Sequence, residues 1–172
     1  DFANLPTHIS FSEIEIQSFI EKAVSIKSYF VTQDPLDKGI RKALNFGHTM
    51  GHAIESYFLT TSTPLLHGEA VAMGIITESF ISFHKGKLNG VELNTIVKTL
   101  QKRLLLSPIS SEAFETIYLL SLHDKKNTST INCVLLNGIG HFELNEPINK
   151  DEILLSLTYY NSSCELYAAQ SK

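Results

Sequence analysis

A short segment around residue 48 gathers side chains that could bind a metal ion and an anionic substrate. On a helical wheel of about 100° per residue they share an arc of about 80°. Two histidines four residues apart can share a metal, or one can bind the metal while the other transfers protons. The alternative is a solvated surface face, which would more often carry lysine, glutamate and glutamine. The stripe consists of Arg41, Asn45, His48, His52 and Glu55.

Three candidates lie outside this stripe. His67 stands at the start of a predicted buried helix, so its ring could face a cleft; the alternative is a helix terminus without a ligand. Lys27 continues the apolar stripe of the first predicted helix. Its ammonium group could turn towards a cleft and meet an anionic substrate, or its stem could snorkel and leave the charge in water. Residues 124–127 form a cationic turn, which charge pattern alone assigns to a solvated loop.

Helical periodicity dominates the elements that must position these residues, so we expect a mainly α domain with one small β-hairpin. One continuous helix over residues 40–58 would hold the whole stripe on one face. The helix from residue 67 is apolar almost all round and should be buried on most sides. Helices are predicted at residues 12–31, 40–58, 67–83, 93–104, 111–122 and 149–169, and hairpin strands at 130–136 and 141–144.

Glycines and capping residues refine this picture. Gly47 and Gly51 fall inside the predicted 40–58 helix, where glycine costs roughly 1 kcal/mol relative to alanine. Two glycines four residues apart therefore predict the close approach of another backbone or a ligand. Ser12 with Glu15, and Asn149 with Glu152, are spaced as capping boxes at the starts of the first and last helices. 

Composition narrows the functional classes. The 172 residues are 43% apolar and 19% charged, which excludes general disorder. The longest apolar runs are four residues, so we expect no membrane span and no signal peptide. The net charge of −4 argues against a nucleic-acid partner. Cys133 and Cys164 are predicted to be free thiols rather than a disulfide, in keeping with a cytoplasmic protein.

Two blocks of sequence carry a resemblance to a known family. They read RKALNFGHTMGHAIE over residues 41–55 and HGEAVAMG over residues 67–74. The chain resembles 3-dehydroquinate synthase from about residue 20 to the hairpin, and the long form of this motif is highly specific. The resemblance implies that residues 1–172 are the α-helical C-terminal domain. It also implies that the NAD-binding N-terminal domain is absent from this chain.

The resemblance also assigns roles to individual residues. His48 and His67 would be ligands of zinc or another divalent metal, while the family's third ligand, a glutamate, has no match here. Asp37 stands where the family usually has glutamate, and its shorter side chain has less reach. The residues that would contact the substrate are His52, Lys27, Arg41, Asn45 and one of Lys125 and Lys126.

The activity implied is a lyase reaction of the shikimate pathway. It converts a sugar phosphate, 3-deoxy-D-arabino-heptulosonate 7-phosphate, to 3-dehydroquinate and phosphate with NAD and zinc, in a full-length enzyme expected to be a homodimer. The alternatives are a related sugar-phosphate cyclase or a metal-dependent polyol dehydrogenase. In a different class, the chain alone could be a non-catalytic helical module, since nothing in it resembles a nucleotide-binding loop. We expect the chain to be inactive by itself.

Overall fold

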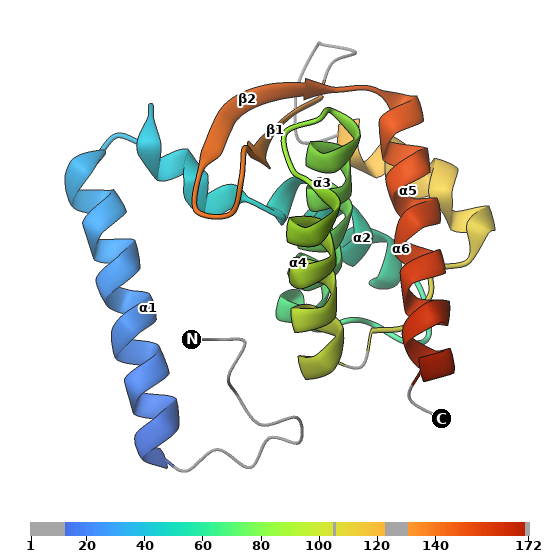
Figure 1. Ribbon diagram of the computed structural model, residues 1–172, viewed down its shortest axis with the longest axis horizontal. Coiled ribbons are helices and arrows are strands. Elements are labelled where there is room, and N and C mark those ends of the chain that lie inside the picture. The colour runs from blue at the N-terminus through green and yellow to red at the C-terminus, as the bar shows by residue number, and fades with distance from the viewer. Residues whose placement is uncertain (1–12, 105, 123–130, 171–172) are drawn as a thin grey trace.

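The structure, a computed structural model, describes residues 13–104, 106–122 and 131–170. Within these residues the chain is mainly α-helical with a single two-stranded sheet, which confirms the predicted fold class (Figure 1). No helix in the described part of the chain combines the length and apolar character needed to cross a membrane. Both cysteines are buried and free, as predicted.

Helix α3 (His67–His84) forms the centre of the molecule. Helices α2 (His48–Phe58), α4 (Gly90–Arg103) and α6 (Lys150–Gln170) pack around it, and α5 (Phe114–Leu122), preceded by the short 3-10 helix η3 (Ser111–Ala113), packs against α2 and α6. Most of α3 is buried, as its apolar circumference predicts. Met50, Ile76 and Tyr160, from α2, α3 and α6, are fully buried in one core.

The predicted continuous helix over residues 40–58 is wrong. The segment divides into a 3-10 helix, η2 (Ile40–Asn45), and α2, separated by Phe46 and Gly47. Gly47 has φ +81°, in the left-handed region that favours glycine, and it precedes the first residue of α2. Gly47 also packs tightly against α3, because a Cβ at this position would lie 2.4 Å from Cγ1 of Ile75.

The close backbone approach predicted from the glycines is present. Gly47 and Gly51 face Gly74 of α3, so that three glycines line the contact between α2 and α3. A Cβ at Gly74 would lie 2.0 Å from the carbonyl oxygen of Gly47 and 2.5 Å from the amide nitrogen of Gly51. Only glycine fits there, and the fit brings the start of α2 directly against α3.

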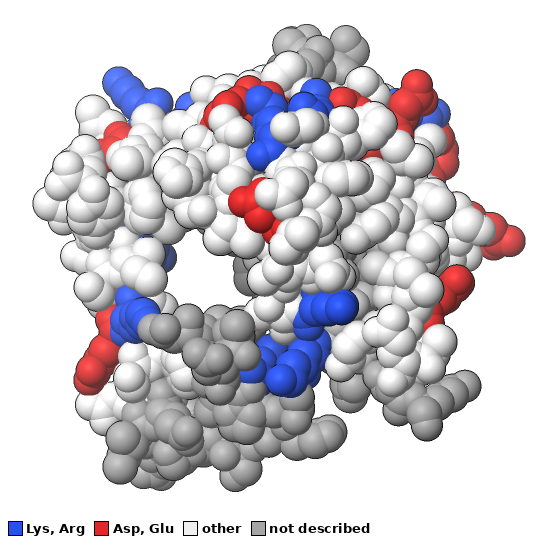
Figure 2. Space-filling view, viewed as in Figure 1, with Lys and Arg blue, Asp and Glu red and all other residues white. Residues whose placement is uncertain are grey.

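Strands β1 (Ile131–Leu136) and β2 (Phe142–Ile148) form the predicted hairpin. Cys133 pairs with Glu146, but the next pair is Leu135 with Glu143, so β2 contributes one extra residue at a bulge. The ammonium group of Lys87, between α3 and α4, forms ion pairs with Glu143 and Glu146 of β2. In Figure 2, acidic and basic atoms lie side by side over this end of the molecule.

Helix α1 (Glu13–Gln33) projects from the body of the molecule, with its main contacts to η2 (Figure 1). The helix is as predicted, but its apolar residues are exposed: Ile20 is 57% and Val24 61% accessible to solvent. Ser12, the predicted cap of this helix, lies outside the described residues. At α6 the predicted capping box is confirmed, since the Asn149 side chain accepts from the Glu152 amide at 3.0 Å and the Glu152 carboxylate from the Asn149 amide at 2.8 Å.

Candidate metal and substrate site

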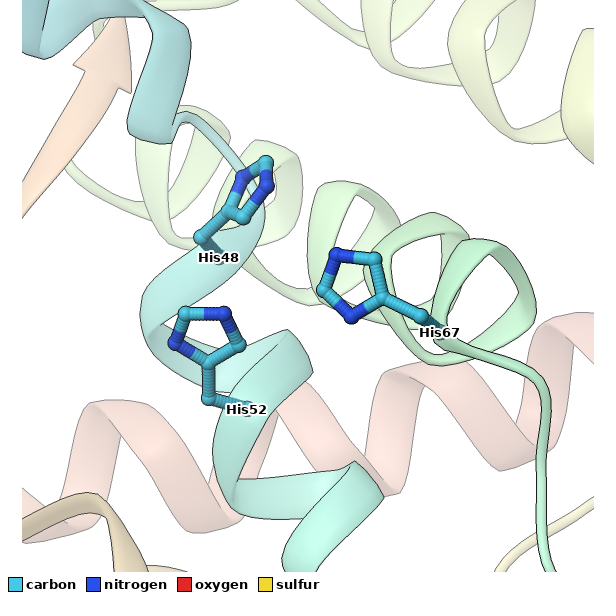
Figure 3. Close-up of side chains that lie close together, drawn as sticks. All are labelled: His48, His52 and His67. Atoms are coloured by element: carbon cyan, nitrogen blue, oxygen red, sulfur yellow. The ribbon is translucent and has the colours of Figure 1, made fainter.

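Three histidine rings meet where α2 lies against the start of α3. His48 and His52 lie one turn apart on α2, and His67 is the first residue of α3 (Figure 3). The ring centroids are 5.4 Å apart for His48 and His52, 5.7 Å for His48 and His67, and 5.8 Å for His52 and His67. One ligand nitrogen from each ring lies within 4.8 Å of the other two. His48 and His67, the two residues for which the resemblance implies a metal role, therefore lie close together, and His52 completes a triangle.

The hydrogen bonds of the rings suit a metal site. Nδ1 of His67 lies 3.1 Å from Oε2 of Glu55, and Nδ1 of His48 lies 3.3 Å from the carbonyl oxygen of Phe46. When these Nδ1 atoms donate, the lone pair of each ring is on Nε2. A tetrahedral zinc with Zn–N bonds of about 2.0–2.1 Å holds its nitrogens about 3.4 Å apart. The ligand nitrogens, which lie within 4.8 Å of one another, would move closer together to bind the ion.

The electrostatic environment favours a neutral His48. Burial lowers the pKa of its imidazole below the ordinary value, and the neighbouring His52 and His67 lower it further, while the hydrogen bond with the Phe46 carbonyl opposes the shift. A neutral ring offers a lone pair to a metal, whereas a protonated ring does not. His52 and His67 are exposed, so the cluster is open to solvent on one side.

A cavity of about 310 Å³ adjoins the histidines. Five of its lining residues come from η2 and the first turns of α2: Lys42, Asn45, His48, Thr49 and His52. The stripe predicted on one helix face therefore contributes to one cavity even though η2 and α2 are separate. Because Lys42 provides a cation here and Asn45 a carboxamide, the cavity presents groups that bind phosphate, carboxylate and hydroxyl oxygens.

The opposite wall comes from the hairpin, which the sequence analysis did not assign to the site. Asn132, Cys133 and Val134 of β1 and Asn145 of β2 line the cavity. Asn145 has φ +56° and occupies the bulge, a device that redirects side chains next to functional sites. An asparagine inside a strand is a weak sequence signal for such a bulge, but no local pattern could show that the hairpin faces α2.

The remaining predicted site residues divide into three groups. Asp37 lines the cavity with φ +53°. Lys27 is exposed on α1, and the guanidinium Nη1 of Arg41 lies 3.4 Å from the carbonyl oxygen of Pro35; neither lines the cavity. Lys125 and Lys126 lie outside the described residues. The substrate roles of all these residues stay predictions.

Glu78 is a further residue next to the site that the sequence did not predict. Its fully buried carboxyl group on α3 accepts hydrogen bonds from the amides of Gly47, at 2.6 Å, and Met50, at 3.0 Å. Burial raises the pKa of Glu78 to about 8, although the amides of Met50, Gly47 and Thr49 oppose the shift. The signal available in the sequence was a carboxylate inside a helix that is otherwise apolar on nearly all sides.

Sequence comparisons connect this geometry to known proteins. The family described as 3-dehydroquinate synthase C-terminal matches residues 3–127. The 3-dehydroquinate synthase of Parabacteroides distasonis is 38% identical over 149 residues, which cover 86% of this chain and 42% of that protein. The enzyme of the same name from Campylobacter hominis is 35% identical over 85% of this chain and 42% of its own length. The chain thus spans less than half the length of the relatives it matches.

Solved structures share the fold. A 2-deoxy-scyllo-inosose synthase, complexed with carbaglucose-6-phosphate, NAD+ and Co2+, superposes with a TM-score of 0.79 at 24% identity, over 92% of this chain and 45% of its own. The 2-epi-5-epi-valiolone synthase of Streptomyces hygroscopicus, with NAD+ and Zn2+ bound, gives a TM-score of 0.67 at 20% identity, over 85% of this chain and 40% of its own. At these identities the likeness concerns the fold.

Proposed function

Because the chain belongs to the 3-dehydroquinate synthase C-terminal family, we propose that it forms the metal- and substrate-binding part of a 3-dehydroquinate synthase. The observation that carries this proposal is the three-histidine cluster beside a cavity lined by a cation and carboxamides. Identities of 35–38% to enzymes of that name, against 20–24% to the related cyclases, favour this activity over another sugar-phosphate cyclase. 

The proposed reaction converts 3-deoxy-D-arabino-heptulosonate 7-phosphate to 3-dehydroquinate and phosphate. Since the chain spans 42% of its relatives' length, we assign NAD binding mainly to a part of the enzyme outside these 172 residues. Two cyclases of this fold were solved with NAD+ and with Co2+ or Zn2+, which supports the same cofactor pair here. We infer that the complete enzyme is a cytoplasmic homodimer. Sedimentation can test the oligomeric state.

Within the cluster, His48 and His67 would hold a divalent metal. When bound, the metal supplies a Lewis acid that polarises hydroxyl and carbonyl oxygens of the substrate. The Glu55 carboxylate orients the His67 ring through Nδ1, which keeps the lone pair on Nε2. The lowered pKa of His48 keeps its ring neutral and competent as a ligand at neutral pH. 

His52 has the geometry for a different task. It lines the cavity, is exposed and lies one helical turn after His48. Its free ring nitrogen would accept or return a proton at a substrate hydroxyl, while Lys42 and Asn45 bind the oxygens of phosphate or hydroxyl groups. The remaining members of the set are proposed on the family resemblance: Lys27, Arg41, Asp37 and one of Lys125 and Lys126.

The test of this function is an assay of the complete enzyme with the heptulosonate phosphate, NAD and Zn2+. His48→Ala should abolish turnover while leaving the fold intact, because the ring faces the cavity rather than the core. His141→Ala, at an exposed histidine on the hairpin turn, is the matched control and should keep full activity. Near-normal activity of His48→Ala at limiting zinc would contradict the metal role of His48.

The chain alone provides a second test. We expect calorimetry to detect weak Zn2+ binding and no NAD binding, since the ligand set is incomplete relative to the family and we assign nucleotide binding to a part of the enzyme outside these residues. Tight, stoichiometric NAD binding to these 172 residues would overturn the division of the enzyme proposed here.

A further inference from the structure

Helix α2 carries two of the three histidines, yet its own sequence provides no cap for its first turn. The residue at the capping position is Gly47, which has no side chain to accept the amide hydrogens that every helix start leaves without partners. A serine, aspartate or asparagine cannot replace it. The 2.4 Å approach of a Cβ to Ile75 excludes a larger residue, and the φ of +81° disfavours one.

Glu78 provides the missing acceptor from a different helix. Its Oε2 accepts from the amide of Gly47 at 2.6 Å, and its Oε1 accepts from the amide of Met50 at 3.0 Å. These two amides flank His48 in the sequence. The two carboxyl oxygens thus bind the first turn of α2 at two points. Glu78 is 31 residues from Gly47 and 28 residues from Met50 along the chain.

A buried carboxyl group at this position is costly. Glu78 is 0% exposed, and no ion pair among the described residues involves it. Burial of an ionisable group without a cation disfavours the folded state unless hydrogen bonds compensate, and a partnership with helix-terminal amides is the compensation available. An apolar residue would fill the same space without this cost, but it could not accept the hydrogen bonds from the Gly47 and Met50 amides.

Those contacts connect the two halves of the histidine cluster. The helix that contains Glu78 begins with His67, and the turn that Glu78 holds contains His48, with His52 one turn further on. We propose that Glu78 is a positioning residue of the metal site: its carboxyl group fixes the start of α2 against α3 and thereby sets the separation of His48 and His52 from His67. This inference rests on the proposed metal role of the cluster.

The test compares the wild-type 172-residue chain with Glu78→Gln, which keeps the shape of the side chain. A carboxyl group can accept at both of its oxygens whether or not one of them carries a proton, whereas a carboxamide can accept only at its single oxygen, and its NH2 group opposes the second amide. We expect the Co2+ affinity, followed by the visible absorption of the bound ion, to fall about tenfold, which is comparable to the loss caused by removing a group that orients a metal ligand directly. 

Thr77→Val is the matched control. Thr77 is equally buried on α3, but its hydroxyl group bonds to the carbonyls of Met73 and Gly74 in the same helix and not to α2. It should lower the unfolding temperature without lowering Co2+ affinity. Equal losses of affinity in Thr77→Val and Glu78→Gln, or unchanged affinity in Glu78→Gln, would show that Glu78 is merely structural.

A second readout separates this inference from the metal proposal. Nuclear Overhauser contacts between the isotope-labelled rings of His48 and His67, measured without metal below each unfolding midpoint, should be present in the wild type and weakened in Glu78→Gln. If the wild type shows the contacts but binds no Co2+, the metal role fails while Glu78 is still judged by the contacts. If the contacts persist unchanged in Glu78→Gln, the positioning role is wrong.

Discussion

Helices α2 and α4 begin in opposite ways. At α4 the caps are local: the Asn89 side chain accepts from the amides of Val91, at 2.9 Å, and Glu92, at 3.0 Å, while the Glu92 carboxylate accepts from the Asn89 amide. At α2 the capping position is Gly47, and the acceptor is Glu78 on another helix. Both residues of the α4 box lie at the helix start itself, although Glu92 also accepts from the Ile139 amide at 3.0 Å, whereas the start of α2 depends wholly on a side chain from another helix.

The two kinds of cap occur on helices with different roles. Helices α4 and α6 both begin with an asparagine–glutamate box and carry no residue of the histidine cluster or its cavity. Helix α2 carries His48 and His52, and its start is defined by contacts to the helix that supplies His67. The helix whose placement against α3 determines the geometry of the histidine cluster is α2, and α2 is the helix that receives its cap from α3.

The largest loss of stability is expected when a substitution disrupts the glycine contact between α2 and α3. Gly74→Ala places a methyl group 2.0 Å from the Gly47 carbonyl oxygen and 2.5 Å from the Gly51 amide nitrogen, and backbone atoms cannot rotate away. Moving α2 outwards would also separate Glu78 from its amide donors. We expect the free energy of unfolding, measured in urea, to fall by more than about 3 kcal/mol.

Gly68→Ala is the control for this substitution. Gly68 lies in the first turn of the same helix, and a Cβ there meets nothing within 4 Å. Alanine should stabilise the protein by about 0.4–1 kcal/mol, since it reduces the entropy of the unfolded chain. A mild effect of Gly74→Ala would show that α2 and α3 can separate without loss of the fold.

The pH dependence of stability should distinguish the two kinds of cap. Burial raises the pKa of Glu78 to about 8, against 4.5 in the unfolded chain, so the native state binds more protons between these values. Its contribution to the free energy of unfolding is therefore full below pH 4.5 and is lost as pH rises through 8. Glu78→Gln should remove this decline from a series of denaturation curves.

Glu92 should act with the opposite sign. Hydrogen bonds from the amides of Asn89 and Ile139 lower the pKa of its exposed carboxylate, so its contribution is present at neutral pH and is lost as the solution is acidified below its ordinary pKa. Glu92→Gln should flatten the acid side of the same curves. Matching pH profiles for Glu78→Gln and Glu92→Gln would remove the distinction between the two caps.

The smallest loss of stability is expected at a local cap. Asn149→Ala removes the side chain that accepts from the Glu152 amide at the start of α6, and caps of this type contribute about 1 kcal/mol. The loss should appear in the unfolding midpoint alone, with Co2+ affinity unchanged. A fall in metal affinity would mean that local caps also affect the cluster.

The contrast between local and distant contacts also explains which features could be predicted from the sequence. The capping box at Asn149 and the hairpin could be predicted because each depends on residues that are close together in the chain. The close approach of a backbone at Gly51 could be predicted because glycine inside a helix usually marks such a contact. The break at Gly47 is not apparent in the sequence, because helical periodicity continues through it and its tight contact with Ile75 of α3 is a tertiary one. The hairpin wall of the cavity, with Asn145, depends on pairing and tertiary contacts that no local pattern contains.

The exposed apolar face of α1 has a practical consequence for experiments on this chain. Ile16, Ile20, Val24 and Tyr29 are all more than 40% accessible while the rest of the fold is intact. Fluorescence of the dye ANS, which is commonly interpreted as evidence for a molten globule, will therefore increase with the fully folded chain. Loss of near-ultraviolet circular dichroism from the buried Tyr160 is the signal that distinguishes a loosened core from a native molecule whose first helix simply binds the dye.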